Sequence, residues 1–212
     1  MHKITSTGSR RSMRSVVTLA LLLLVLTNCA GSMDNVLVTQ PSYQAHVTES
    51  RLSTSSPVRV RIGPVKDVRT DFVGGLIGKR TTIGGTSMGI IEMSPLPTDL
   101  IAQMLRSELS TAGHMIVPDG EDLSIDTKLH KFQVTTPATL FYWDVNGAVE
   151  VTIEMVGSGG KMHEANYATT CTERTFVWPS QEIITTVVTA CIDKIAAQLH
   201  DDAALAKFLG SG

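Results

Sequence analysis

Cysteines, aromatic side chains and charges are all scarce in this sequence. Its 212 residues include three cysteines, and aromatic and charged residues make up only 5% and 18% of the chain. Three cysteines are too few for a disulfide-rich scaffold or a four-cysteine zinc site. The formal net charge of −2 argues against a nucleic-acid binder that works by neutralising phosphates. Hydrophobic residues, at 42%, are abundant enough for the packed core of one domain.

The few charges are distributed unevenly along the chain. Residues 1–28 contain no acidic residue and four basic ones, Lys3, Arg10, Arg11 and Arg14. The rest of the chain therefore has 14 basic and 20 acidic residues, a net charge of −6. An apolar run of 11 residues, Val16 to Leu26, follows the basic segment and is shorter than the roughly 20 residues of a membrane-spanning helix. This pattern predicts a signal peptide over residues 1–28.

The segment Leu26-Thr27-Asn28-Cys29 resembles a bacterial lipobox. The resemblance implies cleavage before Cys29, diacylglyceryl transfer to its thiol, and acylation of the new amine with a fatty acid such as palmitate. Asn28 departs from the pattern, in which a small residue usually precedes the cysteine. The next residue is Ala30 rather than aspartate, which by analogy with Gram-negative lipoproteins implies an anchor in the outer membrane, on its periplasmic face. The alternative is an ordinary secretory signal with an incidental cysteine.

Composition divides the remaining chain into two parts. Residues 29–56 are rich in Ser, Thr, Gln and Asn and predict a flexible, lipid-anchored tether. Residues 57–212 predict a single domain, which begins with a half-buried strand at 58–62. Glycines crowd residues 74–89, which excludes one continuous helix or strand there and favours a mobile surface loop.

Apolar periodicity predicts the other elements of this domain. A helix is expected from Pro97 to about residue 112, ended by Gly113. Strands are expected at 123–134, with a bulge near His130, at 149–155 and at 161–177, and a last helix after Ser180. The order is β-α-β-β-β-α. Because each helix has one apolar face to cover, we expect an α+β two-layer sandwich, a mainly antiparallel sheet with two helices on one face.

Several short motifs occur along the chain, and their order resembles that of the YajG family of bacterial lipoproteins. The resemblance implies an outer-membrane lipoprotein with a small α+β domain and no established enzymatic activity. A longer, more glycine-rich segment at 74–89 departs from the family. Besides the lipobox, the matching motifs are Asp67-Val68-Arg69-Thr70, Thr111-Ala112-Gly113-His114-Met115, Val117-Pro118-Asp119-Gly120, Gly160-Lys161-Met162, Asp201-Asp202 and Lys207-Phe208-Leu209.

The glycine-rich segment does not fit a nucleotide-binding loop. A P-loop needs a glycine, four residues, and then Gly-Lys-Ser/Thr to surround the phosphates. Here Arg80 follows Gly78-Lys79, and Val73 stands five positions before Gly78. We therefore expect no nucleotide and no other cofactor.

The same segment remains a candidate partner-binding loop. Arg69, Lys79 and Arg80 gather positive charge on an otherwise acidic domain, and Phe72 adds an apolar side chain expected to be exposed, as are Leu76 and Ile77. Such a loop could bind a protein or anionic lipid headgroups. The alternative is a surface loop without a partner.

Two cysteines and one aromatic cluster complete the candidate residues. Cys191 falls on the apolar face of the last helix, and Cys171 shares a strand face with Tyr167, so either a disulfide between them or two separate buried thiols is possible. Phe141, Tyr142 and Trp143 are adjacent, and favour core packing over contact with a partner or lipid.

The sequence contains no recognisable catalytic or metal-binding motif. The histidines at 114, 130, 163 and 200 lack the spacing of zinc ligands, and no serine stands in a Gly-x-Ser-x-Gly elbow. Glu150 and Glu154 share the polar side of one strand, which favours a solvated sheet face over a pair of catalytic carboxylates. The first hypothesis is a non-enzymatic lipoprotein that binds another envelope component. The alternatives are an accessory subunit of an envelope transport or assembly complex, like LptE or the transporter-auxiliary lipoproteins, and a hydrolase of envelope polymers.

Overall fold

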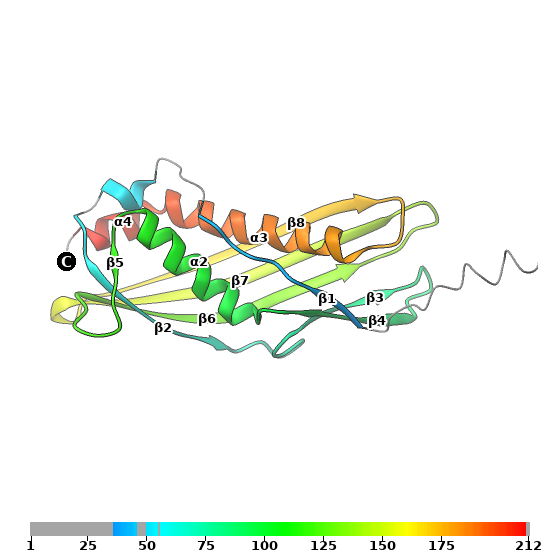
Figure 1. Ribbon diagram of the computed structural model, residues 1–212, viewed down its shortest axis with the longest axis horizontal. Helices are drawn as coiled ribbons and strands as arrows, with labels where there is room; N and C mark the ends of the chain where they lie inside the picture. Colours follow the sequence, from blue (N-terminus) through cyan, green and yellow to red (C-terminus); the bar gives the residue numbers. More distant parts are fainter. Residues whose placement is uncertain (1–35, 46–49, 55, 211–212) are drawn as a thin grey trace, which may run out of the picture. The chain divides into compact units, whose positions relative to one another are not determined.

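The computed structural model describes residues 36–45, 50–54 and 56–210 of the chain (Figure 1). The predicted signal peptide, the predicted lipidation site Cys29 and the first part of the predicted tether lie outside these residues. The described residues belong to one compact unit.

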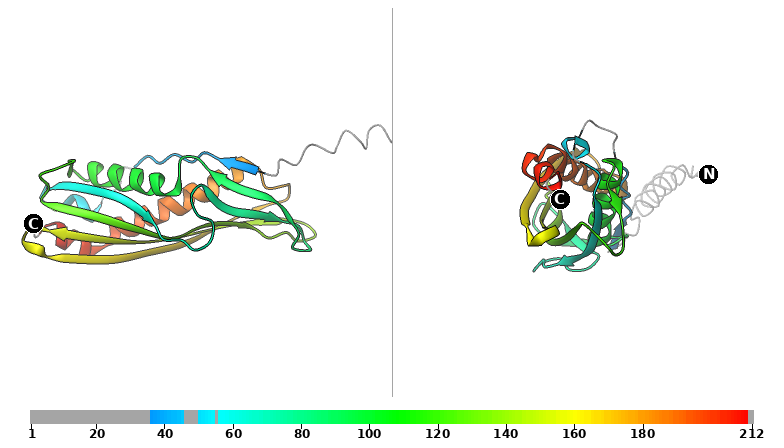
Figure 2. Two further views of the ribbon diagram at one scale, coloured as in Figure 1. Left: turned by 90° about the horizontal axis from the view of Figure 1, so that it is seen from below. Right: turned by 90° about the vertical axis from the view of Figure 1, so that its left-hand side faces the viewer.

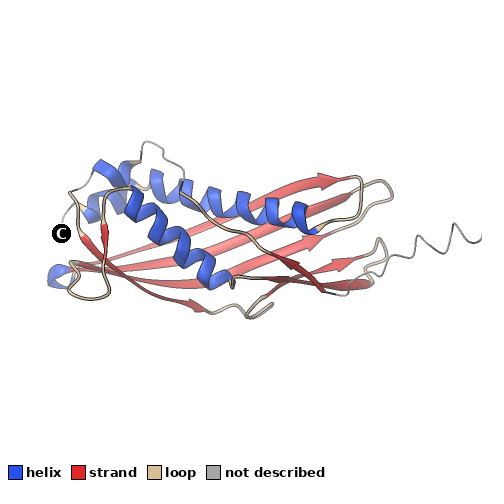
Figure 3. Cartoon of the chain, viewed as in Figure 1, coloured by secondary structure: helices blue, strands red, loops and turns tan. Residues whose placement is uncertain are grey.

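An eight-stranded sheet and three helices make up this unit. The strands are β1 (Val36–Thr39), β2 (Arg59–Asp67), β3 (Leu76–Thr81), β4 (Ser87–Met93), β5 (Met115–Ile116), β6 (Leu123–Thr136), β7 (Trp143–Gly157) and β8 (Met162–Thr175). The helices are α2 (Pro97–Thr111), α3 (Gln181–Asp201) and α4 (Ala203–Leu209), with short 3₁₀ turns η1 (Arg51–Thr54) and η2 (Ser158–Gly160). The helices lie on one face of the sheet, as expected (Figure 3).

The sheet is mixed, so the expectation of a mainly antiparallel sheet is wrong. The long strands β6, β7 and β8 form an antiparallel meander. On the other side of β6, both β2 and β3 pair with it in parallel, and β1 pairs in parallel with β4. Sequence periodicity defines which residues are extended, whereas the direction of a pairing depends on how distant segments meet.

The meander and its covering helices follow the predicted periodicities closely. The expected bulge near His130 is confirmed, because the register between β6 and β7 shifts between Leu129 and Lys131. Ser180 caps α3 by accepting a hydrogen bond from the backbone N–H of Ile183 at 3.4 Å. Gly113 follows α2 with a φ of 94°, a left-handed conformation that favours glycine.

Residues 74–89 form most of a β-hairpin rather than a mobile loop. β3 and β4 are joined by a turn in which the backbone N–H of Thr82 donates to Thr86 O at 2.9 Å. Gly85 has a φ of 78° in this turn, and Gly78 lies where an added Cβ would be 1.9 Å from Val134 O. Glycines therefore occur here because the turn and the close approach of β3 to β6 require them.

Part of the predicted tether belongs to the fold. β1 extends one edge of the sheet beside β4, and Tyr43 and Leu52 are buried at 4% and 0% exposure. The polar composition of residues 29–56 obscured these few apolar residues, which the helices cover. The structure thus corrects the boundary of the domain from residue 57 to about residue 36.

The core lies between the helices and the sheet. Apolar residues of α2 and α3 pack on the inward side chains of β6, β7 and β8, of which Leu129, Val151 and Ile153 are fully buried. By length and composition α3 is apolar enough to cross a membrane, but its apolar face is packed in this core.

Candidate functional site

Arg69 supports the loop before β3 from inside the domain, and the expectation that it lies on a binding surface is wrong. Its side chain is 2% exposed and forms an ion pair with Asp67, with Nη2 2.7 Å from Oδ2. It also donates to the carbonyl oxygens of Gly74 at 2.7 Å and Phe132 at 3.3 Å. The hydrogen bond from Arg69 lowers the pKa of the Asp67 carboxyl.

Arg80 is also buried, at 4% exposure, because β3 turns it toward an aromatic cluster. Its guanidinium lies 5.5 Å from the centre of the Trp178 ring, which meets Trp143 edge to face at 5.6 Å. Ile77, which was expected to be exposed, is fully buried. The predicted cation cluster is therefore divided, with two of its three members inside the protein.

Phe72 and Lys79 form the accessible part of the predicted partner-binding loop. Phe72 is half-buried and has a φ of 57°, in the left-handed region that non-glycine residues rarely adopt. Lys79 is exposed, and its Nζ lies 5.9 Å from the centre of the Phe72 ring. This contact between one cation and one aromatic ring is a small surface compared with the exposed apolar side chains at the end of the sheet.

Three loops present large exposed apolar side chains at one end of the sheet. We call these five residues the apolar tip: Ile83 in the β3–β4 turn, Leu140 and Phe141 in the β6–β7 loop, and Phe176 and Val177 in the β8–α3 loop. Their exposed fractions range from 59% to 80%. The strand pairings place the three loops at the same end, where β1 also begins (Figures 1 and 2).

Aromatic and cationic side chains pack beneath the apolar tip. Tyr142 meets Phe176 edge to face with ring centres 6.4 Å apart, and the Arg174 guanidinium stacks 3.9 Å from the Tyr142 ring centre. Arg174 is in turn paired with Asp144 at 2.8 Å. The sequence located Tyr142 and Trp143 but missed Phe176 and Trp178. The signal was the apolar segment Phe176-Val177-Trp178 before Pro179, because the strand predicted over 161–177 ended inside it.

A buried polar cluster connects the N-terminal segment to two helices. The Tyr43 hydroxyl donates to Glu108 Oε1 on α2, and His200 Nε2 on α3 lies 2.6 Å from Glu108 Oε2. His200 Nδ1 lies 2.5 Å from Ser50 Oγ, which also accepts a hydrogen bond from the Leu52 amide at 3.1 Å. Burial and the hydrogen bond to Glu108 raise the pKa of Tyr43. Ser50, His200 and Glu108 have the residue types of a hydrolytic triad, but Ser50 is only 8% exposed, so we assign the cluster a structural role.

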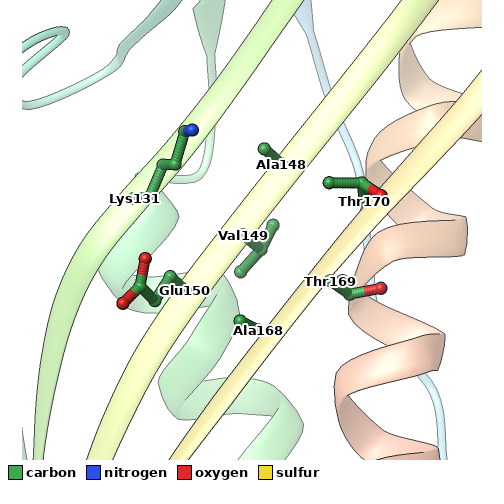
Figure 4. Close-up of a pocket in the computed structure, with 7 residues that line it drawn as sticks. All are labelled: Lys131, Ala148, Val149, Glu150, Ala168, Thr169 and Thr170. Atoms are coloured by element: carbon green, nitrogen blue, oxygen red, sulfur yellow. The ribbon is translucent and has the colours of Figure 1, made fainter.

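The uncovered face of the sheet is polar and contains a hollow of about 430 Å³ over β6, β7 and β8. Figure 4 shows Lys131 and Glu150 beside each other on neighbouring strands, with the helices behind the sheet. Small side chains, Ala148 and Ala168, form its floor. Glu154 is paired with Lys128 on the same face. Glu150 and Glu154 thus lie on the solvated face of the sheet, where Glu154 is paired with Lys128.

The two later cysteines meet between the sheet and α3. The Cys171 and Cys191 sulfur atoms face each other, with Cα atoms 5.6 Å apart, a separation that suits a disulfide. Their side chains are 5% and 1% exposed. Among the described residues, no three His, Cys, Asp or Glu side chains gather as metal ligands would.

Comparison with solved structures places the fold among bacterial proteins. A Xanthomonas campestris protein of family DUF330 superposes with a TM-score of 0.57 at 8% identity, over 83% of this chain and 98% of that one. Lipoprotein GNA1162 of Neisseria meningitidis gives a TM-score of 0.37 at 15% identity, over 66% and 99%. A minor lipoprotein of Acinetobacter baumannii gives 0.39 at 11%, over 67% and 88%. At these identities the first similarity supports a shared fold only.

A search of curated proteins finds no significant match. The sequence model of the family Lipoprotein_16, described as "uncharacterized lipoprotein", matches residues 48–210. This match covers most of the chain and confirms the resemblance to the YajG family. The chain therefore belongs to this family of bacterial lipoproteins.

Proposed function

We propose that this protein is a non-enzymatic lipoprotein, anchored through Cys29 in the outer membrane, with its domain on the periplasmic face, where it binds another envelope component. The observation that carries this proposal is the Leu26-Thr27-Asn28-Cys29 sequence in a member of a lipoprotein family. The position of β1 supports it, because the folded unit begins only a few residues after Cys29. A lipid anchor with two or three acyl chains holds a protein stably on a membrane.

The anchor is tested by Cys29→Ser in the full chain. We expect the variant to accumulate as an unprocessed precursor and to lose incorporation of labelled palmitate, because the thiol that accepts the diacylglyceryl group is gone. Globomycin, which blocks cleavage of lipoprotein signals, should have the same effect on processing of the native chain. The measurements are the size of the protein on a gel and its acyl label.

Asn28→Ala is the matched control for this experiment. It brings the position before the cysteine closer to the lipobox pattern, so processing and acylation should persist. If Cys29→Ser is cleaved normally and released in soluble form, the leader is an ordinary secretory signal and the proposed anchor is wrong.

A second candidate function, an accessory subunit of an envelope transport or assembly complex, is favoured by the hollow on the uncovered sheet face. Its opposite charges on neighbouring strands, Lys131 and Glu150, and its small alanine side chains suit a partner that adds polar contacts to β6–β8. A photo-crosslinking residue in place of Thr170, on the hollow, should then capture one stoichiometric partner in intact cells. The same residue in place of Glu182, at the start of α3, should not capture it.

A further inference from the structure

We propose that the apolar tip inserts into the phospholipid leaflet that holds the lipid anchor, so that the three loops face the membrane. The inference rests on the proposed lipidation of Cys29. It adds a second membrane contact, made by the folded domain itself, and an orientation of the domain on the bilayer.

The tip is the most exposed apolar surface among the described residues. Leu140, Phe141 and Phe176 are 80%, 78% and 75% exposed, the highest values of any large hydrophobic side chain described. Single exposed apolar residues are common, but five on three loops at one end of the sheet gather apolar surface of the kind that marks an interaction site. Side chains this exposed contribute little to the core, so their apolar character favours a role in binding.

Aromatic residues concentrate at this end of the protein. The sequence has ten, five Phe, three Tyr and two Trp, and half of them are here, including both tryptophans: Phe141, Tyr142, Trp143, Phe176 and Trp178. Aromatic side chains with a polar atom favour the zone between lipid headgroups and acyl chains. This arrangement, with Phe and Leu outermost and Trp and Tyr behind, matches the depth profile of a membrane interface.

Charge contributes little to the proposed contact. Arg174 is neutralised by Asp144 at 2.8 Å, and Arg80 is buried against Trp178. Lys79 is the exposed cation nearest to the tip along β3, and Glu173 on β8 is exposed too. Binding should therefore depend on apolar insertion and be insensitive to salt and to the headgroup charge of the lipid.

The short connection from Cys29 to the sheet restricts which end can reach the membrane. Val36 follows Cys29 by seven residues, a span of at most roughly 25 Å when fully extended. Successive pairings place Val36 in one row across the sheet with Lys79, Thr135 and Thr172. From Thr172 back to Met162, at the other end of β8, the distance is roughly 33 Å at the rise of an extended strand. The connection is therefore too short for the Met162 end to face the membrane, but long enough for the apolar tip.

The test compares two labels on the mature lipoprotein in vesicles of phosphatidylethanolamine and phosphatidylglycerol. One variant carries Phe176→Cys at the tip, and the control carries Met162→Cys at the opposite end of the sheet. These side chains are matched in exposure, 75% and 73%, so both labels are equally accessible on the free domain. The readout is the emission wavelength of a polarity-sensitive fluorophore and its quenching by aqueous iodide.

We expect the label at position 176 to be blue-shifted and several-fold less quenched than the label at 162, and equally so in phosphatidylcholine vesicles. Adding Leu140→Ser and Phe141→Ser should remove that protection. The mass of the N-terminal peptide from the same sample reports acylation of Cys29 independently. Equal quenching of both labels on acylated protein overturns this inference alone, whereas an unacylated Cys29 overturns the proposed anchor. Protection at 176 in intact cells but not in vesicles would show that a protein, and not lipid, covers the tip.

Discussion

Arg69 and Arg80 lie beside and within the glycine-rich segment of the sequence and show how a single buried cation supports the fold. Arg69 and Arg80 stand near glycines in a segment with exposed polar residues, and each is nevertheless buried. The desolvation cost of burying Arg69 is offset because Asp67 pairs with its charge and backbone carbonyl oxygens accept hydrogen bonds from its N–H groups. Arg80 rests on the face of Trp178. Each cation holds a loop or strand in place, a role that a sequence pattern cannot distinguish from surface exposure.

Asp67→Asn should therefore destabilise the domain measurably at neutral pH. The substitution leaves the guanidinium of Arg69 buried without its counter-charge, and we expect the free energy of unfolding to fall by about 2–3 kcal/mol. The measurement is urea unfolding followed by tryptophan fluorescence. Asp122→Asn is the control, since its partner Arg59 has a side chain 53% exposed, and it should have little measurable effect.

The same pair should make stability depend on acid. Because Arg69 lowers the pKa of Asp67 in the folded state, the pair stabilises the protein above the ordinary aspartate pKa of about 3.9. That stability is lost as pH falls through the lower folded-state value. The difference between native chain and Asp67→Asn should thus shrink below about pH 4; a difference that stays constant into strong acid would contradict the ion pair.

At the scale of elements, the β3–β4 hairpin shows why glycine content alone led to the wrong prediction of a loop at 74–89. Glycine counts against a strand when nothing else is known, because it packs no side chain. In this hairpin Gly78 is needed, since Val134 O occupies the space where a Cβ would be. The parallel pairing of β3 with β6 therefore depends on the absence of a side chain.

Gly78→Ala should weaken this pairing. An added methyl group 1.9 Å from Val134 O forces β3 away from β6, and we expect a loss of about 3 kcal/mol in unfolding free energy. Hydrogen exchange should show faster exchange of the amides of β3, β4 and β1. Gly84→Ala lies in the adjoining turn, where the added Cβ would be 3.8 Å from Thr82 Oγ1, and it should change neither quantity appreciably.

At the scale of the whole domain, the layers are held together by contacts between distant parts of the chain. The cluster of Tyr43, Glu108 and His200 joins the N-terminal segment to α2 and α3, and the Cys171–Cys191 pair joins β8 to α3. Gly147 on β7 permits α3 to approach, because a Cβ there would lie 2.9 Å from Val187. These contacts determine how the helices lie on the sheet.

We propose that the Cys171–Cys191 disulfide forms in the native protein and stabilises it. The bond closes 20 residues, which corresponds to about 3 kcal/mol in the chain-entropy description. Thiol titration of the unfolded, unreduced protein should detect neither of these cysteines, and reduction should lower the thermal midpoint. Two titratable thiols at positions 171 and 191 would refute the bond.

Much of the secondary structure followed from the sequence, because its signals are local. The β6–β8 meander, its bulge near His130, and helices α2 and α3 follow from alternation, helical spacing and capping within one segment. β1 was missed because four residues carry little periodicity, and its partner β4 is more than 50 residues away in the chain. The predicted partner-binding loop is largely the β3–β4 hairpin, and two of its four named side chains, Arg69 and Arg80, are buried.

The sequence by itself determined the basic N-terminal segment, the cysteine that follows its apolar run, the family, and the long strands and helices from α2 onward. These properties depend on neighbours a few positions apart. Only the tertiary structure decided that the sheet is mixed, that Arg69 and Arg80 are buried, and that Ile83, Leu140 and Phe176 share one end with the start of β1. The physical reason is that strand direction, burial and convergence of loops arise when residues far apart in the chain compete for the same space, and no local pattern records that competition.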